Sequence, residues 1–323
     1  MKAHKPPAST LQLTGVIAAT GVAVAALIVA LGASMGDYFY LASYTILQFA
    51  MLATAWNILG GYSGYVNFGS AGLFASGCYT TILLGKLFAA PLIVCILGGG
   101  LVAGLIGLGT GYLSLRLRGV FFSIATLALS IMLQTLIVNW SFVGGARGVY
   151  VIRPDAVWPF DSYVQMLTVV ICAMATLSVI VAVLVERSWI GFGLAAIRDD
   201  ELAAEASGVP SLRLKLLATT LSGALMGMAG APFPYYITYV DPASAFSLAI
   251  AINTIAMPLI GGTATWWGPV VGALLLGVTQ QVLTVTISSA ANLLVVGLLL
   301  VVFVSVAPNG IVGMARKWRE GRS

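Results

Sequence analysis

Charged side chains are scarce in this sequence: they make up 8% of its 323 residues, whereas 60% of the residues are hydrophobic. A soluble domain carries about 25% charged residues. This composition therefore excludes a soluble globule and indicates a polytopic membrane protein. The formal net charge of +5 needs no nucleic acid partner, because basic loops on the cytoplasmic side of a membrane explain it.

Histidines and motif-forming cysteines are scarce as well. The one histidine, His4, lies in the N-terminal tail, which argues against a catalytic or metal-binding histidine. Cys78, Cys95 and Cys172 lie in apolar runs, at spacings that match no metal or redox motif. We therefore predict no catalytic residue, no metal site and no cofactor, and an intramembrane enzyme is the least favoured class.

Two common energy sources are also missing. The nearest approach to the phosphate-binding loop G-x-x-x-x-G-K-[ST] is Gly85-Lys86, which lacks the first glycine, so the chain is not expected to hydrolyse ATP. A charge inside the bilayer costs at least about 2.5–3.5 kcal/mol and persists there only for function. All 10 acidic residues fall in predicted loops or at span ends, so no proton relay is visible. Sodium sites built from backbone carbonyls stay open.

Long apolar runs are abundant, and a membrane-spanning helix needs about 20 such residues. The sequence predicts an all-α membrane protein of about ten transmembrane helices, with both termini cytoplasmic. The predicted spans are Thr14–Gly32, Tyr38–Gly60, Ser70–Ala89, Leu92–Leu115, Gly119–Trp140, Val164–Val185, Leu214–Ile237, Ser244–Ile260, Gly268–Ile287 and Ser289–Ala307.

The predicted orientation follows from the basic residues. With both ends cytoplasmic, every lysine and arginine lies on the cytoplasmic side except Lys86, Arg147 and Arg153, which is a strong positive-inside signal. This gives a cytoplasmic N-terminal tail (1–13), a transmembrane domain (14–307) with a cytoplasmic loop at 186–213, and a basic cytoplasmic C-terminal tail (308–323). The start of the chain resembles a signal peptide, but its apolar run exceeds the usual h-region, so we expect a retained helix.

The cytoplasmic loop concentrates charge. Seven charged residues fall within Gly191–Lys215. Aspartate is a favoured N-cap, and acidic residues suit the first turn of a helix. Gly208 and Pro210 are typical of a helix end. We predict a short surface helix at about Asp200–Ser207, preceded by a small helical run at Leu194–Arg198. Such a helix is too short to be stable alone, so it must rest on the membrane domain, a partner, or both.

This region is where the sequence resembles a known family. The stretch Gly191–Gly230 is similar to the signature region of LivM-type permeases of branched-chain amino acid ABC transporters. Gly60–Leu83, Leu115–Ser130, Ile260–Leu276 and Val306–Gly313 resemble other family motifs in the right order. The sequence departs from the family's usual motif residues at Ser70, Arg147 and Trp266-Trp267. The identity of the substrate therefore stays open, because relatives of this family import urea, short amides or other amino acids.

The resemblance implies the rest of an importer in a bacterial inner membrane: cytoplasmic ATP-binding subunits, a second permease and a periplasmic substrate-binding protein. It implies that the charged loop seats in an ATPase groove, while the external Ser141–Tyr163 segment faces the binding protein. The candidate ATPase-coupling residues of the charged loop are Ala195, Ala196, Arg198, Asp199, Asp200, Glu201, Glu205 and Gly208.

A polar substrate also needs a pathway lined by small residues, hydroxyls, amides and interrupted helices. The candidate pathway residues are Ser63, Asn67, Ser70, Asn253, Gly261 and Gly262. Helix–helix packing is the competing interpretation for each of them, and the glycine pairs 100/104, 107/111 and 223/227 are expected only to pack helices. The function that follows is an import permease for branched-chain or related amino acids, and the alternative is a stand-alone channel or secondary carrier.

Overall fold

The computed structural model describes residues 8–114, 117, 119–154, 156, 160–263, 265–286, 294, 297, 298, 301 and 310–314. Its α-helices are α1 (Ala8–Met35), α2 (Asp37–Ser63), α3 (Ser70–Phe88), α4 (Leu92–Ser114), α5 (Val120–Val138), α6 (Tyr163–Glu186), α7 (Trp189–Asp199), α8 (Glu201–Ala206), α9 (Ser211–Gly230), α10 (Phe233–Ile237), α11 (Pro242–Ala245), α12 (Leu248–Gly261) and α13 (Gly268–Thr286). Two 3-10 turns, η1 (Ser141–Val143) and η2 (Gly145–Arg147), precede the strand β1 (Val149–Tyr150), which pairs antiparallel with β2 (Tyr239–Val240).

The helices confirm an all-α polytopic membrane protein. Each of the first nine predicted spans coincides with a described helix or a pair of consecutive helices, whereas the tenth, Ser289–Ala307, lies almost wholly outside the described residues. Eight spans in the described part are long and apolar enough to cross a membrane. α2 is not among them, although its 27 residues make it about 40 Å long.

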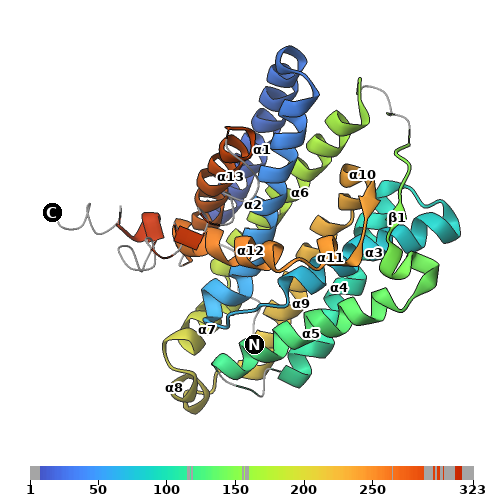
Figure 1. Ribbon diagram of the computed structural model, residues 1–323. Coiled ribbons are helices and arrows are strands. Elements are labelled where there is room, and N and C mark those ends of the chain that lie inside the picture. The colour runs from blue at the N-terminus through green and yellow to red at the C-terminus, as the bar shows by residue number, and fades with distance from the viewer. Residues whose placement is uncertain are drawn as a thin grey trace.

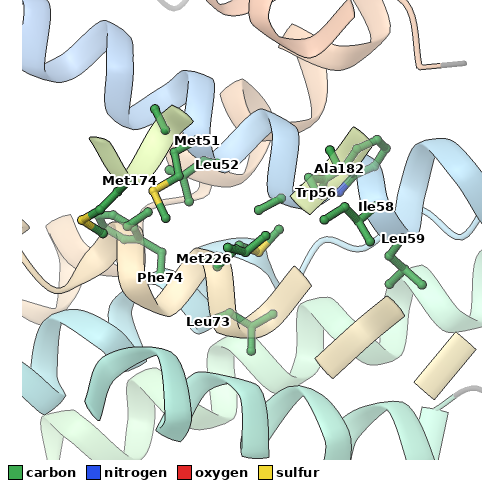
Figure 2. Close-up of a cluster of buried hydrophobic side chains, with 14 of the residues drawn as sticks. Met51, Leu52, Trp56, Ile58, Leu59, Leu73, Phe74, Met174, Ala182 and Met226 are labelled. Carbon is green, nitrogen blue, oxygen red and sulfur yellow. The ribbon is translucent and has the colours of Figure 1, made fainter. Parts of the chain in front are cut away.

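α2 is more polar than those eight spans because it runs through the middle of the bundle. It packs against α6, α9, α12 and α13, and Figure 2 shows its side chains Met51 and Trp56 among residues of α3, α6 and α9. Several of its polar groups find partners inside the protein: Thr54 donates to the Ala50 carbonyl at 2.7 Å, and Gln48 donates to the Tyr44 hydroxyl at 3.1 Å. Buried polar side chains paired in this way lower the hydropathy of α2 without exposing a polar surface to lipid.

Close backbone contacts hold α9 against α3 and α4. A Cβ added at Gly77 of α3 would lie 1.9 Å from the carbonyl oxygen of Gly227 in α9, and one added at Gly107 of α4 would lie 2.9 Å from the Thr219 carbonyl oxygen. Only glycine permits this approach, which is the small-residue packing common in membranes. The prediction that the glycines at 107 and 227 pack helices is confirmed.

Two predicted spans are interrupted helices. The span at Leu214–Ile237 divides into α9 and α10 at Ala231-Pro232, where Pro232 and Pro234 interrupt the helix. The span at Ser244–Ile260 divides into α11 and α12 instead of forming the continuous helix that the sequence predicted. Ser247 explains this second break, because its side chain accepts from the Ala249 amide and caps the start of α12. Asp241 caps the start of α11 in the same way.

The segment from Ser141 to Tyr163 joins α5 to α6. Its described part forms η1, η2 and the short ladder β1–β2, in which Val149 pairs with Val240 and Tyr150 with Tyr239. Arg153 fixes it further by donating from Nε to the Tyr235 carbonyl at 2.7 Å. The helices α7 and α8 lie at the bottom of Figure 1, at the other end of α6 from this segment.

Candidate functional site

The connector between α6 and α9, residues 187–210, folds into two short helices because both have side-chain caps. The Ser188 hydroxyl accepts from the Ile190 amide at 3.2 Å and starts α7. The Asp200 carboxylate accepts from the Leu202 and Ala203 amides, at 2.9 and 3.1 Å, and starts α8. Gly208 follows α8 with a φ of +85°, the conformation typical of a helix end. This confirms the predicted helix near Asp200–Ser207.

α7 is longer than predicted. It begins at Trp189 rather than Leu194, because Ser188 caps it. Gly191 lets its first turn fold back onto the end of α6, since a Cβ there would lie 2.4 Å from the Val185 carbonyl oxygen. The cap and the glycine were both visible in the sequence, but the apolar run around them resembles a continuation of α6.

The connector has one buried face and one exposed face. Leu194, Ile197 and Ala204 are buried against the membrane domain, which supplies the support that short helices need. The predicted coupling residues divide between the faces: Arg198, Asp199, Asp200, Glu205 and Gly208 are exposed, whereas Ala195, Ala196 and Glu201 are partly buried.

Two large apolar side chains on the exposed face were missed by the sequence reasoning. Leu202 of α8 is 63% exposed and Phe192 of α7 is 69% exposed. Interface cores are enriched in aromatic residues such as phenylalanine and depleted in charged ones, so these two side chains are candidates for contact with a partner. Leucine within the polar sequence of α8 was the available signal.

Beneath α8 lies a buried cluster that the sequence reasoning did not predict. Nζ of Lys215 in α9 is 2.7 Å from Oε1 of Glu201, and these side chains are 3% and 15% exposed. The Tyr65 hydroxyl, from the α2–α3 loop, donates to Glu201 Oε2 and accepts from Lys215 at 3.1 Å. The Lys215 ammonium also lies 4.6 Å from the centre of the Tyr65 ring, within the range of a cation–π contact.

The cluster adds contacts that the sequence did not predict for Glu201, a candidate coupling residue, and for Lys215, which was placed on the cytoplasmic side. The Glu201 side chain is 15% exposed and the Lys215 side chain is 3% exposed. A buried charge is retained when it is paired and hydrogen-bonded. Lys215 falls just inside the predicted span Leu214–Ile237, and a lysine in that position was the sequence signal for a buried partner.

Other contacts join the connector to the end of α2. Arg198 donates from Nη1 to the Gly61 carbonyl at 3.3 Å. Tyr62 donates to the Glu186 carboxylate at 3.1 Å, where α6 ends. The last turn of α2 is therefore hydrogen-bonded to the connector through Arg198 and to the end of α6 through Glu186.

Three of the predicted pathway residues come together at the α2–α3 junction. Ser63 ends α2 and donates to the Leu59 carbonyl at 2.6 Å. Asn67 accepts from the Gly69 amide through its side chain at 2.8 Å, and its carbonyl accepts from the Trp56 indole at 2.9 Å. Ser70 begins α3 with a fully buried hydroxyl that has no hydrogen-bond partner in the described part of the chain.

The other predicted pathway residues lie where α12 meets α13. The Gln280 amide donates to Asn253 Oδ1 at 2.9 Å. A Cβ at Gly261 would lie 1.8 Å from the Gly268 carbonyl oxygen, and Gly262 has a φ of +125°. These two glycines therefore permit a tight helix hairpin. The hairpin adjoins α2, since Asn57 donates to the Thr265 carbonyl at 3.3 Å.

A cavity of about 390 Å³ opens beside the α2–α3 loop and the connector. Its lining includes Ser63, Tyr65, Ser123, Arg198 and Glu201. In the part of the chain that the structure describes, no three His, Cys, Asp or Glu side chains gather as metal ligands would. The polar groups that line this cavity are hydroxyls, a guanidinium and a carboxylate, all of which can form hydrogen bonds.

Comparisons with known proteins identify a family and several relatives that this chain resembles. The model of the family described as branched-chain amino acid transport system / permease component matches residues 38–304. The high-affinity branched-chain amino acid transport system permease protein LivM of Escherichia coli (strain K12) is 27% identical over 293 residues, covering 83% of this chain and 68% of LivM. LivM of Salmonella typhimurium gives the same values. The probable branched-chain amino acid transport permease protein LivH of Methanocaldococcus jannaschii is 25% identical over 272 residues, covering 79% of this chain and 84% of LivH. No solved structure matches the chain.

Proposed function

Because the chain belongs to the family of branched-chain amino acid transport permeases, we propose that it is the permease subunit of an ABC importer in a bacterial inner membrane. Separate cytoplasmic ATP-binding subunits drive it, and its substrates are branched-chain or related amino acids. A second permease subunit and a periplasmic binding protein complete the importer. Urea or a short amide is the alternative substrate class for the same machine.

The observation that carries this proposal is the folded connector. A loop that only joined two spans would need no buried face, yet α7 and α8 are capped, supported from beneath and hydrogen-bonded to the end of α2. Their outer face presents Phe192 and Leu202 beside exposed acids. Such a supported, partly apolar face suits the groove of a partner subunit.

In the proposed mechanism, closure of the ATP-binding subunits displaces α7 and α8. These helices continue directly from α6 and lead directly into α9, so their displacement changes the packing of both spans and opens the pathway to each side in turn. The α2–α3 junction, with Ser63, Asn67 and Ser70, is the proposed pathway element. Its loop backbone is hydrogen-bonded to α2 and α5, which supports a defined rather than random structure.

Co-purification tests this proposal. We expect the affinity-tagged chain, expressed with ATP-binding subunits of a branched-chain amino acid importer from the same organism, to retain them through detergent extraction and size-exclusion chromatography. The control replaces them with the ATP-binding subunits of an unrelated importer, which should not be retained. Full insertion of the chain without any retained ATP-binding subunit would speak for the stand-alone channel or carrier instead.

A further inference from the structure

The buried cluster beneath α8 joins three elements that are far apart in the sequence. Lys215 belongs to α9, Glu201 is the first residue of α8, and Tyr65 lies in the α2–α3 loop, 150 residues before Lys215. The Tyr65 ring also packs edge-on against Phe122 of α5, with ring centres 5.1 Å apart. The cluster therefore connects the connector directly to a loop that is not its neighbour in sequence.

The contacts in this cluster are strong and directional. Each carboxylate oxygen of Glu201 has its own partner, the Lys215 ammonium on Oε1 and the Tyr65 hydroxyl on Oε2. Hydrogen bonds in which one partner is charged are about twice as strong as neutral ones, and burial of the pair limits screening by salt. A displacement of Glu201 therefore pulls on Tyr65 as well as on Lys215.

Arg198 provides a second attachment to the same region. Its guanidinium reaches the Gly61 carbonyl at 3.3 Å, and its aliphatic stem covers Gly64, since a Cβ there would lie 3.1 Å from Arg198 Cγ. Gly64 has a φ of +76°, where the chain leaves α2. The connector thus holds the α2–α3 loop at two points, Gly61–Gly64 and Tyr65.

The loop that is held in this way contains the proposed pathway residue Asn67 and is flanked by two others, Ser63 and Ser70. Asn67 lies two residues after Tyr65, and Ser70 opens α3 with its unpaired buried hydroxyl. The cavity of about 390 Å³ lies against Ser63, Gly64, Tyr65 and Glu201. Movement of the loop into this space does not require close-packed side chains to be displaced.

Building on the proposed function, we propose that Tyr65, Glu201 and Lys215 form a coupling strut, which transmits the displacement of α8 to the α2–α3 junction. The displacement of α8 then reaches the α2–α3 junction through this cluster as well as through α6 and α9. The three residues are positioning residues: they move the substrate pathway without touching substrate. A purely structural role predicts something different, namely that the cluster seats α8 and that its loss weakens the docking of the ATP-binding subunits.

Tyr65→Phe is the most selective test, because it removes only a hydroxyl and keeps the ring. We expect ATP-binding subunits to co-purify as with the wild type and ATP hydrolysis to continue in proteoliposomes. Leucine imported per ATP hydrolysed should fall by at least about tenfold, the factor that corresponds to losing one hydrogen bond to a charged group. The double variant Glu201→Gln with Lys215→Gln should have the same effect without leaving a single buried charge. Tyr38→Phe is the matched control, because Tyr38 is 54% exposed at the other end of α2.

Three outcomes overturn part of the account, and they are distinguishable. Unchanged import per ATP in Tyr65→Phe and in the double variant overturns the strut alone. A fall in import that parallels a loss of co-purifying ATP-binding subunits assigns the cluster to docking, and this also overturns the strut. A wild-type chain that retains no ATP-binding subunits overturns the proposed function itself.

Discussion

Replacing Asp199 and Glu205 by lysine should abolish both the retention of ATP-binding subunits and substrate import. Both carboxylates are on the exposed face of the connector, and the Asp199 side chain is 77% exposed. Reversing a charge in a docking surface turns attraction into repulsion, and each loss of about 1.4 kcal/mol weakens association tenfold. We expect at least about a tenfold loss of affinity, measured by co-purification and by titration of the purified ATP-binding subunits.

Asp200 requires separate treatment because it caps α8. Its reversal would unfold the helix as well as change the charge, since loss of an N-cap costs about 0.5–2 kcal/mol. Asp200→Asn keeps a capping side chain and removes the charge, so it is the appropriate third substitution. A variant that combines all three changes and still inserts, binds the ATP-binding subunits and imports normally would refute the docking role of this face.

The matched control places the same change of charge at the opposite end of the protein. Asp37 begins α2, and Asp161 directly precedes α6, whose other end leads into the connector. α6 has 24 residues, which separates its ends by about 36 Å. Asp37→Lys with Asp161→Lys should leave the retention of ATP-binding subunits unchanged. Equal losses in the two double variants would indicate a general effect of charge rather than a docking surface.

Gly272→Ala is expected to prevent stable folding. A Cβ at Gly272 in α13 would lie 1.8 Å from the carbonyl oxygen of Met257 in α12 and 3.0 Å from the Gly261 amide nitrogen. The backbone cannot yield as a flexible side chain would, so α12 and α13 must separate. Overpacking costs about 1–3 kcal/mol or more, and we expect at least this loss in thermal unfolding of the detergent-solubilised protein.

Gly109→Ala provides the control for that substitution. Gly109 also lies within a helix, α4, but a Cβ there has nothing within 4 Å. Alanine exceeds glycine in helix propensity by about 0.8–1.0 kcal/mol, so this variant should be as stable as the wild type or more stable. Equal stability of the two variants would contradict the close helix contact.

The positions of the spans were predictable because their signals are local. About 20 apolar residues in succession mark a span, and Asp200, Gly208 and Pro210 mark the ends of α8 without reference to the rest of the chain. The break between α11 and α12 was missed, because an apolar run conceals a cap such as Ser247. Hydropathy alone does not distinguish a continuous span from two helices with a capped junction.

The candidate site was predictable only where its residues lie close together in the sequence. The exposed acids of the connector were identified, but burial of Glu201 and Lys215 depends on Tyr65, which lies 136 residues before Glu201. No sequence period relates residues so far apart. The same limit applies to Gly261 and Gly262, whose roles in packing depend on how α13 folds back on α12.

The most direct test of the central claim is leucine flux into proteoliposomes with and without the ATP-binding subunits. If the chain is a passive pathway that partners drive, the purified chain alone should give no flux down a leucine gradient above that of empty liposomes. The complete complex, with binding protein and ATP, should accumulate leucine against a gradient. Substantial flux through the purified chain in the absence of ATP-binding subunits would contradict this account and identify a stand-alone channel or carrier.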